Sequence, residues 1–145
     1  MSRRKGRILA FQALYSHDVG GVSIEDLLTF SWVNKDENPD ADYDNEAYTF
    51  ARLLITGTME HITQIDDLIK QYLSAHWDFD RVNKVSLAIL RMSVYSLLYQ
   101  KETNSSIVID EAINIAKDFG SDDSFKFINA VLDKISKVAQ ISEEG

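Results

Sequence analysis

The chain has 145 residues, 45% of them hydrophobic, which is enough for one globular domain with a substantial core. It has no cysteine, which excludes disulfides, thiolate nucleophiles and soft-metal sites, and no apolar run approaches the roughly 20 residues of a membrane span. Its 15 basic and 23 acidic residues give a formal net charge of −8, which argues against a uniformly basic nucleic-acid-binding protein. We therefore expect a cytoplasmic protein with no membrane segment and no secretory signal.

The basic residues are unevenly distributed and begin the chain. Arg3, Arg4, Lys5 and Arg7 all precede the first acidic residue, Asp18, so the remainder is strongly acidic. A basic terminus on an acidic body is typical of a short nucleic-acid-binding arm. The solvated start of a helix would give the same pattern, and this alternative stays open.

The first segment is predicted to be helical from about residue 3 to residue 18, and the Gly20-Gly21 pair is a good stop signal. Ser23 then has the character of an N-cap for a short helix that reaches Trp32. The acidic stretch at 34–46 contains the only proline and is predicted to be an exposed loop. Its carboxylates lack the rhythm and the turn glycine of a hard-metal loop.

A long apolar stripe predicts helix over residues 47–73, where Gly57 is a candidate bend. Asp80 is the expected cap of the next helix, which should reach about Gln100. That helix is apolar on nearly every side, so we expect it to be central and covered by several neighbours.

Two further helices are expected over residues 106–119 and 122–138, with Gly120 between them and Ser121 as a cap. The second carries an apolar stripe that includes Phe125 and predicts inward packing. No useful strand-like alternation occurs in the sequence.

These segments together predict an all-α fold. We expect two small packed helical subdomains, at approximately residues 1–75 and 76–140, within one domain that covers residues 1–145. The division should fall near residues 75 to 80.

The sequence offers no pattern for catalysis. His17, His61 and His76 lack metal-ligand spacing, and there is no Rossmann glycine motif, P-loop or nucleophile elbow. The adjacent Asp66 and Asp67 would point in different directions on a helix and form no acid–base pair. We expect no catalytic residue, no metal and no cofactor.

Arg91 is the only charged residue between Lys84 and Lys101, in the most apolar helix. A guanidinium cannot lose its charge, so burial would require a carboxylate partner. We predict a structural ion pair of Arg91 with Glu111 or Asp133. A ligand-binding role is the alternative.

Three blocks of sequence stand out along the chain. The first is the basic stretch at 3–7, which leads into A-F-Q-A-L-Y at 10–15. The second is A-I-L-R-M-S-V-Y at 88–95. The third spans 110–134 and contains D-E-A, A-K-D-F-G and D-S-F-K-F-I-N-A-V-L-D-K. Together these blocks resemble the NusB family of bacterial transcription antitermination factors, and they keep the family's order and spacing, so the resemblance covers nearly the whole chain.

The resemblance implies a NusB-like helical bundle without catalytic activity. Such proteins bind boxA RNA together with NusE, a small-subunit ribosomal protein. The complex joins elongating RNA polymerase as part of the antitermination complex and supports transcription of ribosomal RNA operons.

By position, the resemblance assigns RNA binding to two groups of residues. One is the basic arm, and the other lies in the last two helices; together they comprise Arg3, Arg4, Lys5, Arg7, Phe119, Asp123, Lys126 and Phe127. Basic residues attract phosphate, and aromatic faces can stack unpaired bases. Core packing is the alternative role for both phenylalanines.

The basic arm should act through one helical face. A helical start would align Arg3, Arg4 and Arg7 on a face that continues to Phe11. We therefore expect deletion of residues 1–7 to weaken RNA binding with little loss of stability.

The candidate protein-partner residues are Ser86, where the family usually has an acidic residue that helps contact NusE, and Glu111. A purely protein-binding helical adaptor is the main alternative function, because the acidic body suits a basic ribosomal protein. An RNA-methyltransferase that carries a NusB-like domain is not expected, since the chain is too short to add a cofactor-binding fold.

Overall fold

The computed structural model describes residues 2–33, 45–73 and 78–144, with side chains placed up to residue 139. These residues form helices and contain no strand, which confirms the all-α prediction. The elements are α1 (Ser2–Gly20), α2 (Ile24–Leu27), α3 (Asn45–Glu60), α4 (Ile62–Tyr72), the 3₁₀ helix η1 (Phe79–Arg81), α5 (Lys84–Tyr99), α6 (Ser105–Phe119) and α7 (Ser124–Glu144).

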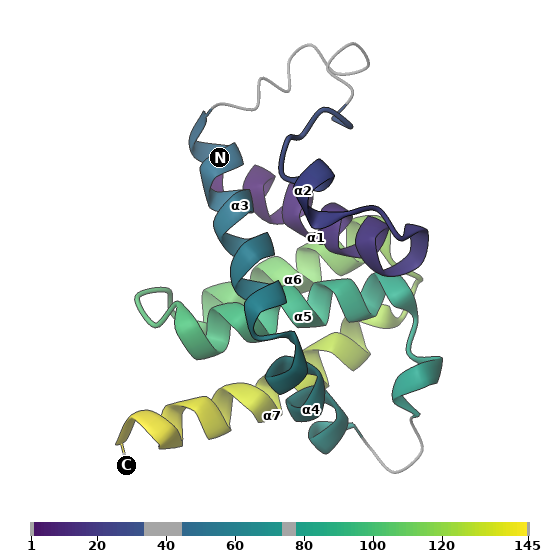
Figure 1. Cartoon of the computed structure of the whole chain (residues 1–145). Coiled ribbons are helices and arrows are strands. Elements are labelled where there is room, and N and C mark those ends of the chain that lie inside the picture. The colour runs from purple at the N-terminus through teal and green to yellow at the C-terminus, as the bar shows by residue number, and fades with distance from the viewer. Residues whose placement is uncertain (1, 34–44, 74–77, 145) are drawn as a thin grey trace.

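Helix α5 is the centre of the fold, as its sequence predicts. It packs against α1, α3, α4, α6 and α7, and Figure 1 shows it crossing the middle of the molecule. Leu87, Leu90 and Val94 are completely buried, as is Ile89 elsewhere on the helix. A helix buried on all sides needs no polar face, which explains its nearly continuous apolar sequence.

The start of α5 differs from the predicted one. The side chain of Asn83, and not that of Asp80, accepts hydrogen bonds from two backbone amides of the first turn. Asp80 lies in η1, whose own cap is Asp78. Val82 separates the two elements with extended backbone and is only 3% exposed. Burial of this side chain in the core therefore moves the helix start three residues along the chain.

The predicted cap of α2 is confirmed, but the helix is shorter than expected. The Ser23 hydroxyl accepts a hydrogen bond from the Asp26 amide at 3.1 Å, and the helix ends at Leu27. Phe30, three residues later, has a positive φ of 57° and is 4% exposed. The chain therefore turns at Phe30, and its ring packs in the core. Most of the predicted acidic loop, residues 34–44, lies outside the described residues.

The long helical stretch is divided at His61 and not at Gly57. Gly57 lies within α3 and is buried against the ring of Tyr95. A Cβ atom at this position would lie 2.1 Å from Tyr95 Cζ. The glycine therefore permits close approach of α3 and α5, which explains its presence without a bend.

We expect Gly57→Ala to destabilise the protein by about 2 kcal/mol, because overpacking outweighs the better helix propensity of alanine. Chemical denaturation monitored by circular dichroism would measure the loss. Gly20→Ala is the matched control, since the nearest atom to its Cβ would be 3.7 Å away. The cost should shrink in a Tyr95→Leu background, and full additivity of the two substitutions would contradict the proposed clash.

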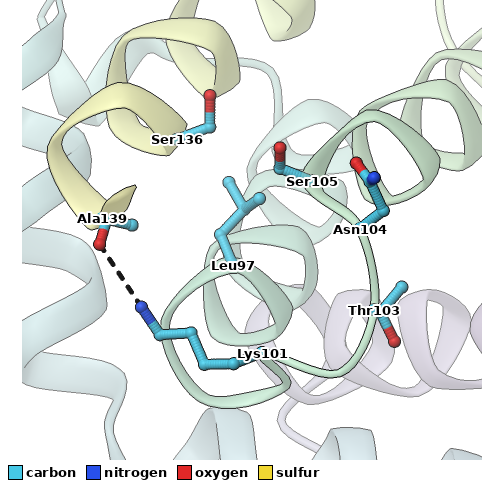
Figure 2. A pocket seen from close by; sticks show the side chains of 7 residues that line it. All are labelled: Leu97, Lys101, Thr103, Asn104, Ser105, Ser136 and Ala139. Atoms are coloured by element: carbon cyan, nitrogen blue, oxygen red, sulfur yellow. Dashed lines mark hydrogen bonds between the residues drawn. The ribbon is translucent and has the colours of Figure 1, made fainter. Parts of the chain in front are cut away.

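A small cavity of about 210 Å³ lies where α5, α6 and α7 meet (Figure 2). Lys101 Nζ donates to the carbonyl oxygen of Ala139 at 3.4 Å across one side of it. Asn104 caps α6 by accepting from the Ser106 amide, and the Ser136 hydroxyl donates to the Asp133 carbonyl. These polar groups are bonded within the chain, so the cavity is part of a helix junction.

A single hydrophobic cluster contains buried residues of every α-helix. The predicted division into subdomains near residues 75 to 80 stays a prediction, and residues 74–77 lie outside the described part of the chain. Among the described helices, none is both long enough and apolar enough to cross a membrane.

Candidate nucleic-acid interface

The basic residues at the chain start form the first turns of α1 and are anchored against α3. Gly6 permits this packing, because a Cβ there would lie 2.9 Å from Phe50 Cδ2 and 3.0 Å from the Ala47 carbonyl oxygen. Gly6 and Ala47 are both buried. The start of the chain is therefore an integral part of the helical bundle.

Arg3 and Arg7 both face the ring of Phe50. Their guanidinium carbons lie 5.1 Å and 5.3 Å from its centroid, within the range of a cation–π contact. Arg3 is exposed, but Arg7 is only 6% exposed, and burial is the main cause that lowers the pKa of Arg7. The structure thus does not support Arg7 as a phosphate contact, and deletion of residues 1–7 would remove core packing as well as charge.

Arg4 faces α6 and not α3. Its Nε and Nη2 donate to the two carboxylate oxygens of Glu111 at 3.2 Å and 3.1 Å, in a bidentate pair. This hydrogen bonding and the attraction of the Glu111 charge raise the pKa of Arg4. The expected single face of arginines is therefore wrong, because Arg4 and Arg7 contact different helices.

The end of α6 presents an aromatic side chain beside α1. Phe119 is 43% exposed, and its ring centroid lies 5.3 Å from that of Phe11, which is buried. The Phe119 ring thus contacts the buried ring of Phe11 while much of its side chain remains accessible. This arrangement favours a stacking role for Phe119 over core packing.

The predicted residues of α7 and the turn before it are split between surface and core. The side chains of Asp123 and Lys126 are 84% and 70% exposed and form an ion pair at 3.6 Å. Phe127 is half-buried and packs against the core cluster. These contacts favour core packing, the alternative role of Phe127, over RNA stacking.

Lys117 and Phe125 also belong to this region, although the sequence did not identify them as candidates. Lys117 Nζ and Lys126 Nζ lie 4.9 Å and 6.0 Å from the ring centroid of Phe125, which is half-buried. The apolar stripe of α7 identifies Phe125 only as a core residue. Its contact with Lys117 depends on the packing of α6 against α7, and no local sequence signal reveals it.

We give the name α1–α6 surface to a set of basic and aromatic side chains at the start of α1, the end of α6 and the start of α7. It comprises Arg3, Arg4, Lys5, Lys117, Phe119 and Lys126, of which Lys5 is half-buried. In Figure 1, α1 crosses in front of α6, and the Arg4–Glu111 and Phe11–Phe119 contacts join the two helices. The surface combines phosphate-attracting groups with an accessible ring.

Arg91 ties together three helices on another side of the bundle. Its Nε and Nη2 donate to the carboxylate of Asp66 at 2.8 Å and 2.9 Å, and its Nη1 lies 3.5 Å from Asp18 Oδ2. The side chain of Arg91 is 14% exposed and that of Asp66 is 18% exposed. This largely buried network joins α5 to α4 and α1.

The predicted partners of Arg91 were therefore wrong. Glu111 is paired with Arg4 at the start of α1, whereas the Arg91 network reaches Asp18 near the end of that helix, and Asp133 faces solvent. The Asp133 carboxylate is 54% exposed and pairs with Lys137, one turn along α7, at 3.1 Å. The structure gives Asp133 no structural role in the core.

The candidate protein-partner residues also differ from expectation. Ser86 is 2% exposed in the first turn of α5, and its amide donates to the Asn83 side chain. A side chain turned into the core cannot contact a partner, so the structure does not support Ser86 in that role. Glu111, with a side chain 15% exposed, is occupied by Arg4.

The described residues contain no group of three His, Asp or Glu side chains arranged to hold a metal ion. Among the acidic residues, Asp78 caps a helix and Asp66 forms an ion pair.

Comparison with known sequences gives consistent results over the whole fold. The NusB family model matches residues 4–137. The transcription antitermination protein NusB of Treponema denticola is 57% identical over 135 residues, which cover 93% of this chain and 96% of that protein. The protein of the same name from Borreliella burgdorferi is 44% identical and covers 90% of this chain and 91% of its own length.

Solved structures agree with the sequence comparison. T. maritima NusB superposes with a TM-score of 0.80 at 37% identity, over 93% of this chain and 90% of that chain. A structure of antitermination factors NusB and NusE in complex with dsRNA gives a TM-score of 0.79 at 28% identity, over 94% of this chain and 97% of that chain. Because family model, relatives and structures agree over nearly the full length, this chain belongs to the NusB family.

Proposed function

We propose that this chain is a transcription antitermination factor that binds boxA RNA together with NusE. The observation that carries the proposal is the α1–α6 surface, where an exposed basic turn lies on the same pair of helices as the accessible ring of Phe119. The similar fold of NusB in a complex with NusE and dsRNA supports it.

The surface suits RNA in two ways. Arg3, Arg4 and Lys5 supply positive charge that attracts the phosphate backbone of RNA, while the rest of the protein is acidic. Phe119 supplies a flat apolar face on which an unpaired base can stack. Phosphate contacts would hold the RNA on the surface, and stacking would favour single-stranded segments.

The proposal includes the protein context of the RNA. We propose that NusE, a basic ribosomal protein, binds the acidic body, and that the complex joins RNA polymerase during transcription of ribosomal RNA operons. Charge complementarity supports this partner, since the chain carries a net charge of −8 despite its basic start. In this proposal the protein is a binding module and not an enzyme.

An RNA-binding titration with and without NusE tests the proposal. We expect the chain to bind an RNA that carries a boxA element more tightly than a scrambled RNA of equal length, and we expect NusE to strengthen boxA binding. Fluorescence anisotropy at fixed salt would measure both affinities. Association with NusE without any RNA binding would replace the proposal with the protein-adaptor function.

A further inference from the structure

The ion pair between Arg4 and Glu111 joins an exposed cation to a sheltered carboxylate. The side chain of Arg4 is 56% exposed, whereas that of Glu111 is 15% exposed. Glu111 lies on α6 directly before the buried Ala112, so its position is set by the packed helix. The exposed Arg4 side chain is therefore held in place by the sheltered Glu111 carboxylate.

The pair leaves most of the Arg4 guanidinium available. Arginine has five N–H donors, and Glu111 accepts from Nε and Nη2 in a side-on bidentate arrangement. The two donors on Nη1 and the second donor on Nη2 have no part in these two bonds. Because Arg4 is more than half exposed, they can reach a phosphate at the surface.

We infer that Glu111 is a positioning residue for RNA binding. Its carboxylate fixes the Arg4 guanidinium, so that Arg4 holds one phosphate of the RNA at a set place relative to Phe119. This inference rests on the proposed RNA-binding function. It assigns Glu111 to the RNA surface and not to a protein partner. Phe119 lies two helical turns beyond Glu111 on the same helix, so α6 links the phosphate contact to the ring.

A fixed phosphate contact affects sequence preference through register. Phosphate contacts carry no base information themselves, but they determine which base stacks on Phe119, and bases differ in how strongly they stack. A mobile Arg4 would still attract RNA by its charge, although it would no longer select one register at Phe119. The carboxylate removes the ordering cost of a long side chain before RNA arrives.

The test is the ratio of the dissociation constants for scrambled and boxA RNA of equal length, measured with NusE present. Removal of the Glu111 charge strengthens the general attraction of the protein for any RNA. Because both RNAs carry the same charge, this effect is equal for the two and cancels in the ratio. We expect Glu111→Gln to lower this ratio about three- to tenfold, the effect of one side chain that must be ordered on binding. Asp110→Asn, an exposed neighbour on α6, is the control with the same charge change and should keep the ratio.

A double variant separates positioning from a structural effect. In an Arg4→Gln background, Glu111→Gln should not reduce the ratio further, because the group that it positions is absent. A merely structural role of Glu111 would lower the ratio in both backgrounds and would overturn the inference. Thermal melts of each variant would show that binding is measured on folded protein.

The remaining outcomes are distinguishable. An unchanged ratio for Glu111→Gln, with normal boxA preference in the unmodified protein, would overturn the positioning role alone. A higher ratio would show that Glu111 competes with RNA for Arg4, which also contradicts it. Absence of boxA preference in the unmodified protein would overturn the proposed function and this inference together.

Discussion

Replacement of Arg91 by methionine should lower the free energy of unfolding by about 3 kcal/mol, at the low end of the cost of breaking a buried ion pair. Asp66 would keep a carboxylate that is 18% exposed and that has lost its bidentate donor. The same change would release Asp18 at the end of α1. The loss arises mainly from the unpaired carboxylates, because methionine retains much of the apolar volume.

For a chain of this size, the loss corresponds to a fall in Tm of roughly 10 °C, measurable by calorimetry. Asp133→Asn is the matched control. It removes one member of the exposed Asp133–Lys137 pair and should cost less than about 1 kcal/mol. Equal melting temperatures for Arg91→Met and the unmodified protein would show that the network contributes no net stability.

The second large effect concerns RNA affinity. Combined replacement of Arg3, Arg4 and Lys5 by glutamine should reduce the log–log salt slope of binding by about 2, at roughly 0.7 for each single-strand phosphate contact. If the variant and the unmodified protein bind equally at the 1 M reference salt, this slope difference makes the variant bind about a hundredfold more weakly than the unmodified protein at 0.1 M salt. Arg7 is left in place because it is buried.

A titration series between 0.05 and 0.5 M salt, roughly the range over which counterion release is resolved, would give both affinity and slope. The control is Lys84→Gln/Lys134→Gln/Lys137→Gln, which removes the same charge from exposed positions outside the α1–α6 surface. We expect the control to retain most of the slope. If both triple variants lost affinity and slope equally, only net charge would matter and the surface assignment would be wrong.

Local sequence patterns were sufficient for much of the fold. The period of the apolar residues predicts helices, and the uniformly apolar segment before Gln100 predicts that α5 is central. Ser23 was correctly identified as a cap because its hydroxyl bonds to an amide only three residues away. The exact start of α5 was not predictable in this way, since Asp78, Asp80 and Asn83 are all competent caps. Burial of Val82, a contact with the rest of the core, decides among them.

The family blocks assign Arg4, Lys126 and Phe119 to RNA binding, and all three side chains are exposed, but the blocks could not show which charges were already paired. Local patterns along the chain were enough to predict the helices, the central segment, the family and the basic start of the chain. Packing between helices was needed to establish that Arg91 binds Asp66, that Arg4 binds Glu111 and that Arg7 is buried against Phe50. Each of these contacts joins two different helices, and it depends on how the helices are rotated and shifted against each other. That arrangement results from packing of the whole core, and no spacing of residues along one helix specifies it.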